Sequence, residues 1–216
     1  MIKRIGMLVL ASAALSGCAA KTVPLDVSQV ENFGQRSLVS VNQPAPVFLP
    51  MRPSTGALGM VGAAMMLSEG QTYAEAYHVK DPTPSLEADL TRRLQARYRI
   101  AAGEPMTMAD TDAKAGYPVA NGTLYVDART FSWGYAYFPF NWGRYTVRYG
   151  AWMQVIDGAT SKVIAQHQCL EDSHKDGSTA PTLDELLADR SALLNAELEK
   201  LALVCAAQFE AAALAA

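Results

Sequence analysis

The stretch from Gly122 to Cys169 constrains the fold most, because it predicts several consecutive β-strands. Residues 124–130 (LYVDART) place Leu, Val and Ala on one side and Tyr, Asp and Arg on the other, the alternation of a half-buried strand. Residues 145–157 and 162–169 follow, separated by Asp157-Gly158, a hairpin signal because glycine readily adopts positive φ. We expect three or four antiparallel strands here, within an α+β domain whose antiparallel sheet has four to five strands packed by two or three helices.

Aromatic side chains are concentrated between two of these strands, with eight of them in residues 131–145. The odd-numbered aromatics from Phe131 to Tyr137 share one face of a regular strand, whereas Phe138, Phe140 and Trp142 are even-numbered, which predicts a register shift near Phe138-Pro139. Three interpretations are open: core or hairpin packing, an exposed surface for a partner or lipid, and a carbohydrate-stacking platform. The candidate partner surface comprises Trp133, Tyr135, Tyr137, Phe138, Phe140 and Trp142.

One amphipathic helix is predicted to begin at Thr83-Pro84, since proline is favoured at the first helical position. Leucines recur every fourth residue from Leu86 to Leu94 and form a single apolar stripe. Glu87 and the arginines at 92, 93 and 97 are then free to face water. Ser37 to Val41 alternates as a further strand, and the prolines that follow it predict an edge strand or an extended connector.

A longer helix is predicted from Thr182 to about Phe209, because Thr182 and Glu185 fit a capping box. Its apolar stripe includes Cys205, which therefore faces the sheet, where Cys169 ends a strand. We expect a disulfide between Cys169 and Cys205; the alternative is two free buried thiols. The bond would close a loop of 37 residues, counting both ends, and the chain-entropy model gives about 4 kcal/mol for that length.

Residues 57–67 form an uncharged apolar run of eleven residues. A membrane-spanning helix needs about 20 residues, so the run predicts a buried helix whose small residues pack closely against a neighbour. A self-association face or a membrane-contacting face is the main alternative. Thr72 and Glu75 resemble another capping box, which predicts a short second helix after Gly70.

The amino terminus has the pattern of a secretory signal, with Lys3-Arg4 before an apolar run over residues 5–15. The run ends in Leu15-Ser16-Gly17-Cys18, which resembles the lipobox of bacterial lipoproteins. This resemblance implies that residues 1–17 are cleaved and that Cys18 is acylated; an ordinary signal with a chance cysteine is the alternative. Ala19, in place of an aspartate, implies by the same resemblance the periplasmic face of the outer membrane of a Gram-negative bacterium.

The lipobox also sets the expected organisation of the remaining chain. Residues 18–35 show little periodicity and are predicted to be a lipidated tether, and residues 36–211 a periplasmic α/β domain. Without residues 1–17, 16 lysines and arginines remain against 21 acids, a formal net charge of −5. This balance argues against nucleic-acid binding, which needs a basic surface. The expected partners are the lipid bilayer, through acylated Cys18, and an envelope protein or lipid.

Catalytic and metal-binding motifs are not evident in the sequence. His167, Cys169, Asp172 and His174 suggest a metal site, but a disulfide-bonded cysteine is not a metal ligand, so we expect no metal. The sequence has no G-x-S-x-G, H-E-x-x-H or S-x-x-K motif. We therefore predict no catalytic residues and no cofactor.

Residues 84–209 resemble the periplasmic domains of small envelope lipoproteins, such as the curli secretion channel subunit and the auxiliary lipoproteins of lipid transporters. VIDGATSKVIAQ is similar to their strand–turn–strand phrase D-x-x-T-G-K, except that Gly158 follows Asp157 directly and Ser161 precedes Lys162. The resemblance implies a non-catalytic binding or assembly module for an envelope partner. The alternatives are a subunit of an oligomeric secretion, pore or transport complex, and a periplasmic enzyme acting on envelope material.

Overall fold

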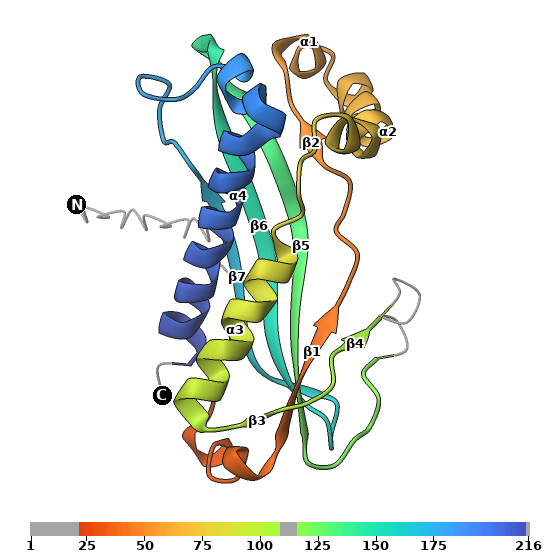
Figure 1. Ribbon diagram of the computed structural model, residues 1–216, viewed down its shortest axis with the longest axis vertical. Coiled ribbons are helices and arrows are strands. Elements are labelled where there is room, and N and C mark those ends of the chain that lie inside the picture. The colour runs from red at the N-terminus through yellow and green to blue at the C-terminus, as the bar shows by residue number, and fades with distance from the viewer. Residues whose placement is uncertain (1–21, 109–115, 215–216) are drawn as a thin grey trace, which may run out of the picture.

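The computed structural model describes residues 22–108 and 116–214, which form a mixed α+β domain with a seven-stranded sheet and four α-helices (Figure 1). Two short 3-10 helices, η1 and η2, precede the sheet. The elements are η1 (Val27–Gln29), η2 (Phe33–Gln35), β1 (Ser37–Asn42), β2 (Leu49–Pro50), α1 (Pro53–Gly56), α2 (Met60–Ala76), α3 (Thr83–Tyr98), β3 (Ala101–Ala102), β4 (Met106–Thr107), β5 (Thr123–Phe138), β6 (Asn141–Asp157), β7 (Lys162–Asp172) and α4 (Leu183–Ala213).

The sheet is mixed, so the expectation of a purely antiparallel sheet is wrong. Strands β5, β6 and β7 form the predicted antiparallel meander, whereas β1 pairs in parallel with β5, β3 and β4, and β2 pairs in parallel with β5. The cause is the long helical connection between β1 and β5, which returns the chain to the end of the sheet at which β1 began. The predicted strand at Ser37 is confirmed as β1, and the proline-rich segment after it supplies β2.

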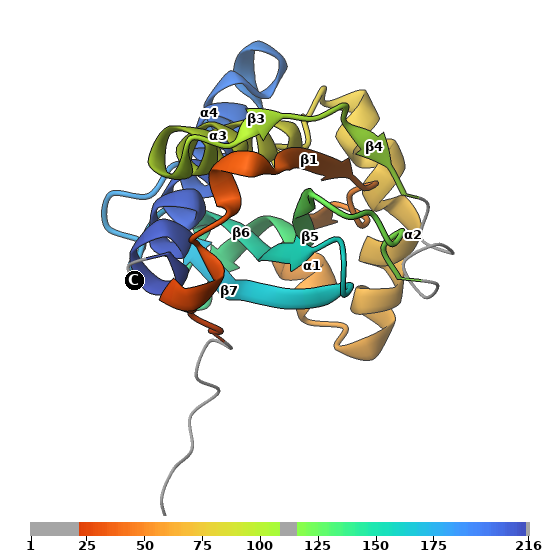
Figure 2. The same cartoon turned by 90° about the horizontal axis from the view of Figure 1, so that it is seen from below.

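Helices α3 and α4 lie side by side on one face of the sheet (Figures 1 and 2), and the main core fills the space between them and β5, β6 and β7. The leucine stripe of α3 is buried as predicted. The capping box of α4 is also confirmed: Glu185 N donates to Thr182 Oγ1, and Thr182 N donates to the Glu185 carboxylate. Two expectations about helices are wrong: α2 continues through Gly70 without a second start, and Glu87 is only 4% exposed.

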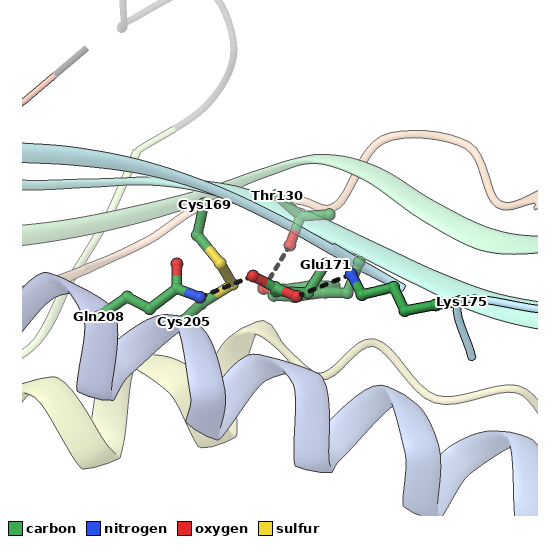
Figure 3. Close-up of a disulfide and its surroundings, with 7 residues drawn as sticks. Thr130, Cys169, Glu171, Lys175, Cys205 and Gln208 are labelled. Atoms are coloured by element: carbon green, nitrogen blue, oxygen red, sulfur yellow. Dashed lines mark hydrogen bonds and ion pairs between the residues drawn. A yellow bond between two sulfur atoms is a disulfide. The ribbon is translucent and has the colours of Figure 1, made fainter. Parts of the chain in front are cut away.

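The disulfide joins β7 to α4 across the core. Cys169 and Cys205 are both buried, and their Cα atoms are 5.5 Å apart. Figure 3 shows the bond between the helix and the sheet, beside a hydrogen bond of 2.6 Å from Gln208 Nε2 to Glu171 Oε1. Lys175 Nζ lies 3.6 Å from the other oxygen of Glu171. Covalent and polar contacts therefore hold the same two elements together.

The β6–β7 turn forms after Asp157 as predicted, but glycine has a different role there. Ser161 adopts positive φ (54°), and Gly158 does not. Gly158 is required because a Cβ at this position would lie 2.7 Å from the carbonyl oxygen of Ala120. The constraint is thus the close approach of two backbones.

The first described residues pack against the domain, where the sequence predicts a tether. Val23 forms an isolated antiparallel bridge with Gln166 of β7, and Leu25 N donates to the Ala213 carbonyl of α4. Leu25 and Phe33 belong to the main core. Residues 22–35 therefore contribute to the folded domain.

Replacing Gly70 by alanine is expected to destabilise the protein by about 1–3 kcal/mol, the usual cost of overpacking. A Cβ at this position in α2 would lie 2.0 Å from the Phe48 carbonyl oxygen, which β2 and its flanking segment hold in place. Urea denaturation measures the effect. Gly143→Ala is the matched control, since open space surrounds Gly143, and an equal effect of the two substitutions would contradict the close-packing interpretation.

Candidate interaction surface

The aromatic stretch divides into a buried part and an exposed part. Trp133 and Tyr135 are 4% and 1% exposed and pack against Phe48. Their polar atoms are bonded inside the protein: Trp133 Nε1 donates to the Pro46 carbonyl at 2.6 Å, and Tyr135 Oη donates to Tyr73 Oη at 2.7 Å. Burial strongly raises the pKa of the Tyr135 hydroxyl. These two residues are core residues, so their assignment to the partner surface is wrong.

The face of each aromatic is decided by a bulge that the sequence pattern does not reveal. The β5–β6 register shifts between Thr130 and Ser132, in addition to the predicted shift after Tyr137. As a result, Val126 and Ala128 lie in the same core as Trp133, although their positions differ in parity. Phe131 instead contacts Trp152, with ring centroids 6.2 Å apart, and does not share the core face with Trp133.

The remaining predicted surface residues lie towards the tip of the β5–β6 hairpin. Tyr137 and Phe138 are half-buried, and the Tyr137 ring lies against Gly56 of α1. Phe140 is fully exposed, at 103%, and Trp142 is 67% exposed. The hairpin therefore presents two aromatic side chains to the outside, at the end of the molecule where α1 and α2 also lie (Figure 1).

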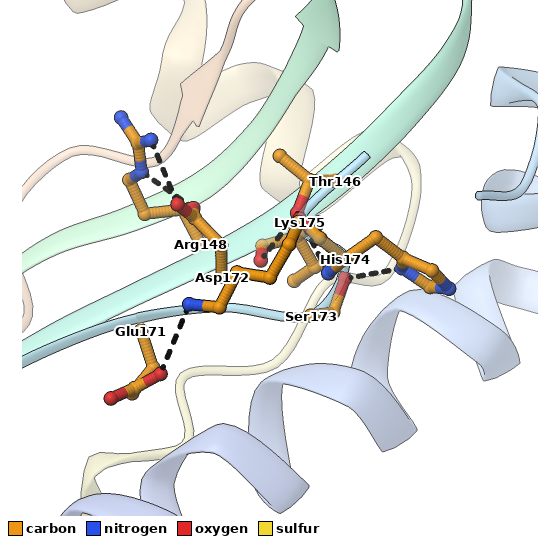
Figure 4. Close-up of polar contacts among 8 residues, drawn as sticks. Thr146, Arg148, Glu171, Asp172, Ser173, His174 and Lys175 are labelled. Carbon is orange, nitrogen blue, oxygen red and sulfur yellow. Dashed lines mark hydrogen bonds and ion pairs between the residues drawn. The ribbon is translucent and has the colours of Figure 1, made fainter. Parts of the chain in front are cut away.

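The base of this hairpin is braced by the segment that follows β7 (Figure 4). Arg148 forms a two-point ion pair with Asp172, with Nε–Oδ1 and Nη2–Oδ2 distances of 2.8 and 3.1 Å. Thr146 Oγ1 donates to the His174 carbonyl and accepts from His174 N, both at 3.1 Å. Val147 N donates to Ser173 Oγ at 2.9 Å. The bracing continues to the tip, where Arg144 Nη1 donates to the Ala180 carbonyl at 2.9 Å and Asn141 Nδ2 donates to the Gly177 carbonyl at 3.3 Å.

Helix α2 adds a second exposed apolar region, contrary to the expectation of a buried helix over residues 57–67. Gly62 and Met66 are buried, but most of the run faces outwards, and Met60 is 89% exposed. We call the following six side chains the apolar end: Leu58, Met60, Val61, Leu67, Phe140 and Trp142. In the sequence, the uncharged run was the only feature that could point to an exposed apolar surface on α2. The spacing of its apolar residues did not distinguish the buried face of the helix from the exposed face.

The two chain segments that form the apolar end carry no charged residue. Residues 53–68 and residues 130–143 contain no Asp, Glu, Lys or Arg. Exposed apolar side chains that gather in one region indicate a contact with another molecule or with a membrane, whereas scattered ones do not. Arg144 follows the tip at once, and Arg52, which precedes α1, is turned inwards, 4.7 Å from the Tyr73 ring centroid.

The other predicted site residues are placed as follows. Cys18 lies outside the described residues. Thr22 Oγ1 is 2.9 Å from His167 Nδ1, and burial lowers the pKa of His167. His174 Nδ1 is 2.9 Å from Ser173 Oγ, but this hydroxyl also accepts the Val147 N–H, which gives it a structural role in the hairpin base.

Metal ligands and membrane spans were sought among the described residues. Within ranges 22–108 and 116–214, no group of three or more His, Cys, Asp or Glu residues has the geometry to hold a metal ion. In the same ranges, every helix is too short or too polar to cross a bilayer.

No protein-family model matches the chain, and no curated protein matches it. Among solved structures it is similar to the PelC dodecamer from Paraburkholderia phytofirmans, with a TM-score of 0.35, 11% identity, and coverage of 85% of this chain and 96% of that one. It is also similar to protein XCC0632 from Xanthomonas campestris, described by family model DUF330, with a TM-score of 0.37, 13% identity, and coverage of 88% of this chain and 92% of that one. A third similar structure is the hypothetical protein CT253 from Chlamydia trachomatis, with a TM-score of 0.34, 11% identity, and coverage of 81% of this chain and 97% of that one. At these TM-scores the likenesses assign neither a family nor a function.

Proposed function

We propose that the protein is an outer-membrane lipoprotein on the periplasmic side, anchored through acylated Cys18, whose domain is a non-catalytic binding or assembly module for an envelope partner. The observation that carries the binding role is the apolar end, where two uncharged segments far apart in sequence expose large side chains together. The lipobox pattern at residues 15–18 supports the anchor. The structural role of Ser173 beside His174 supports a non-catalytic reading.

Replacing Cys18 by serine is expected to abolish acylation, because only a thiol forms the thioether to the lipid. The variant should lose the acyl mass and shift from the membrane fraction to the soluble fraction, since several acyl chains at about 0.8 kcal/mol per buried methylene supply the anchoring energy. Mass spectrometry and membrane fractionation measure both effects. Retention of a normally processed variant in the membrane would defeat the anchor proposal.

The binding role is tested by a photo-crosslinking amino acid at position 140, with position 121 as the control. Asn121 is exposed and precedes β5, at the opposite end of the sheet. In intact cells we expect crosslinks to an envelope protein or lipid from residue 140 and not from residue 121. Equal crosslinking from both positions, or none from either, would contradict a specific role for the apolar end.

An oligomeric secretion, pore or transport subunit is the second candidate function. The exposed, uncharged outer face of α2 supports it, because such a face also suits packing between copies. The mass of the lipidated protein in detergent, measured by light scattering, separates the two candidates. A stable ring or other multimer favours the second, and a monomer favours the first.

A further inference from the structure

The shape of the apolar end sets what can cover it. Phe140, at 103% exposure, and Met60, at 89%, project from the surface and are not part of a flat patch. They come from a hairpin tip and from the start of α2, and the Tyr137 ring of β5 lies against Gly56 of α1, the short helix that precedes α2. Any molecule that covers this end must accept protruding side chains from two separate elements.

We propose that the lipid bilayer itself covers the apolar end, and that the domain lies along the membrane with its long axis near the membrane plane. The proposal rests on the function proposed above, namely anchoring through Cys18. It adds the identity of the partner at this surface and the orientation of the domain.

Two hollows of the chain offer the protruding side chains of a second copy no uncharged socket. These hollows, of about 520 and 680 Å³, share a lining of His78, Lys80, Asp81 and Arg190. Inserting an apolar ring there would take charged groups out of water without a partner, which is unfavourable. A bilayer needs no matching hollow, because acyl chains and headgroups rearrange around an inserted side chain.

The chemistry of the tip suits the interfacial region of a bilayer. Trp142 Nε1 donates to the Pro139 carbonyl at 2.6 Å, so the polar atom of the indole is bonded while its ring stays exposed. Tryptophan is enriched at the level of the headgroups for this combination of an apolar body and a polar handle. Arg144, directly after the tip, is held by the protein, because it donates to the Ala180 carbonyl at 2.9 Å and lies 3.7 Å from Glu185. Backbone groups of the turn still require water or headgroup partners, which limits the insertion to this region.

The length of chain between Cys18 and the folded domain determines the orientation. Cys18 precedes Val23 by five residues, which span at most about 18 Å when fully extended. Val23 pairs with Gln166 on β7, which lies opposite Gln154 on β6. Thirteen residues of β6 separate Gln154 from Asn141 at the tip, or about 43 Å of strand. A domain standing upright on its tip would hold Cys18 about 25 Å above the bilayer, so both contacts form only when the domain lies flat.

The test uses the acylated full-length protein reconstituted into vesicles of phosphatidylethanolamine and phosphatidylglycerol. A single environment-sensitive fluorophore is attached to Phe140→Cys, Met60→Cys or Asn121→Cys, all at exposed positions, with the native disulfide oxidised. With brominated acyl chains in the vesicles, we expect quenching at positions 140 and 60 to exceed that at 121 by about threefold or more, because only the first two enter the interface. Phe140→Glu with Trp142→Glu should reduce the quenching at position 60.

Orientation is read from energy transfer to acceptor headgroups, which should be similarly efficient from positions 140 and 121. Much weaker transfer from position 121 would overturn the flat orientation. Acylated, vesicle-bound protein without quenching at 140 and 60 would overturn the bilayer contact and leave the proposed anchoring and binding role standing. If the labels at positions 140 and 60 were shielded in the absence of vesicles and the protein had a multimeric mass, the result would overturn the bilayer contact in favour of a second copy of the chain. A protein that lacks acyl mass and stays off vesicles would instead defeat the proposed function.

Discussion

A variant in which Cys169 and Cys205 are both alanine is expected to lose about 3–4 kcal/mol of unfolding free energy relative to the oxidised protein. The two cysteines are separated by 36 positions in the sequence and are both buried. Without the bond, the unfolded chain regains the loop-closure entropy that the crosslink had removed. Alanine avoids the cost of burying two hydroxyl groups, which serine would add.

Urea denaturation of the double variant, monitored by tryptophan fluorescence, measures the loss. The control is the unaltered protein after reduction, which should unfold close to the double variant because both lack the crosslink. Non-reducing mass analysis should find no free thiol at these positions before reduction. An unfolding midpoint equal to that of the oxidised protein would contradict a stabilising role for the bond.

Glu87→Gln is expected to remove a large part of the pH dependence of stability between about pH 4.5 and 8. Glu87 lies on α3, and its Oε1 atom accepts no hydrogen bond from any described residue. Burial raises the pKa of its carboxyl group to about 8, and the nearby charges of Asp127 and Asp81 add to the effect. The structure therefore favours the neutral acid at this position.

The sign of the effect follows from proton binding in the two states. Between pH 4.5 and 8 the unfolded chain has released this proton and the folded protein still holds it, so the unfolding free energy falls as the pH rises. Below this window both states are protonated, and above it both are ionised. The shift corresponds to about 3–5 kcal/mol lost across the window, at 1.36 kcal/mol per pKa unit. Glutamine keeps the size of the side chain and does not ionise.

Chemical denaturation at a series of pH values measures this slope in both proteins. Glu104→Gln, at an exposed position, makes the same change of charge and should leave the slope unaltered. Burial also raises the pKa of Asp127, against the opposing effects of Tyr117 and Arg129, so a residual slope of the same sign is expected in the Glu87 variant. Parallel slopes in the unaltered protein and the Glu87→Gln variant would contradict the assignment.

Local signals in the sequence predicted the helices and strands whose stabilising contacts lie within a few residues along the chain. The capping box at Thr182 and the leucine repeat of α3 define two helices, because caps and helical stripes depend on residues three or four positions apart. Alternation predicted the β5–β6–β7 meander, since neighbouring strands joined by short turns pair with each other. The pairing of Cys169 with Cys205 followed from the same patterns, because a strand end and a helix stripe both faced the core. For Cys18 the sequence is the sole basis, and its acylation stays a prediction.

Only the tertiary structure decided the features that depend on contacts distant in sequence. The extra residue at the Phe131 bulge reverses which aromatics face the core, and such a bulge is set by the partner strand. The exposure of α2 and of the hairpin tip depends on which surfaces α3 and α4 leave uncovered. Glu87 is an ionisable residue, a type that predicts exposure, yet packing buries it. Periodicity reports that a face is apolar, but whether another element covers that face is settled when the chain folds.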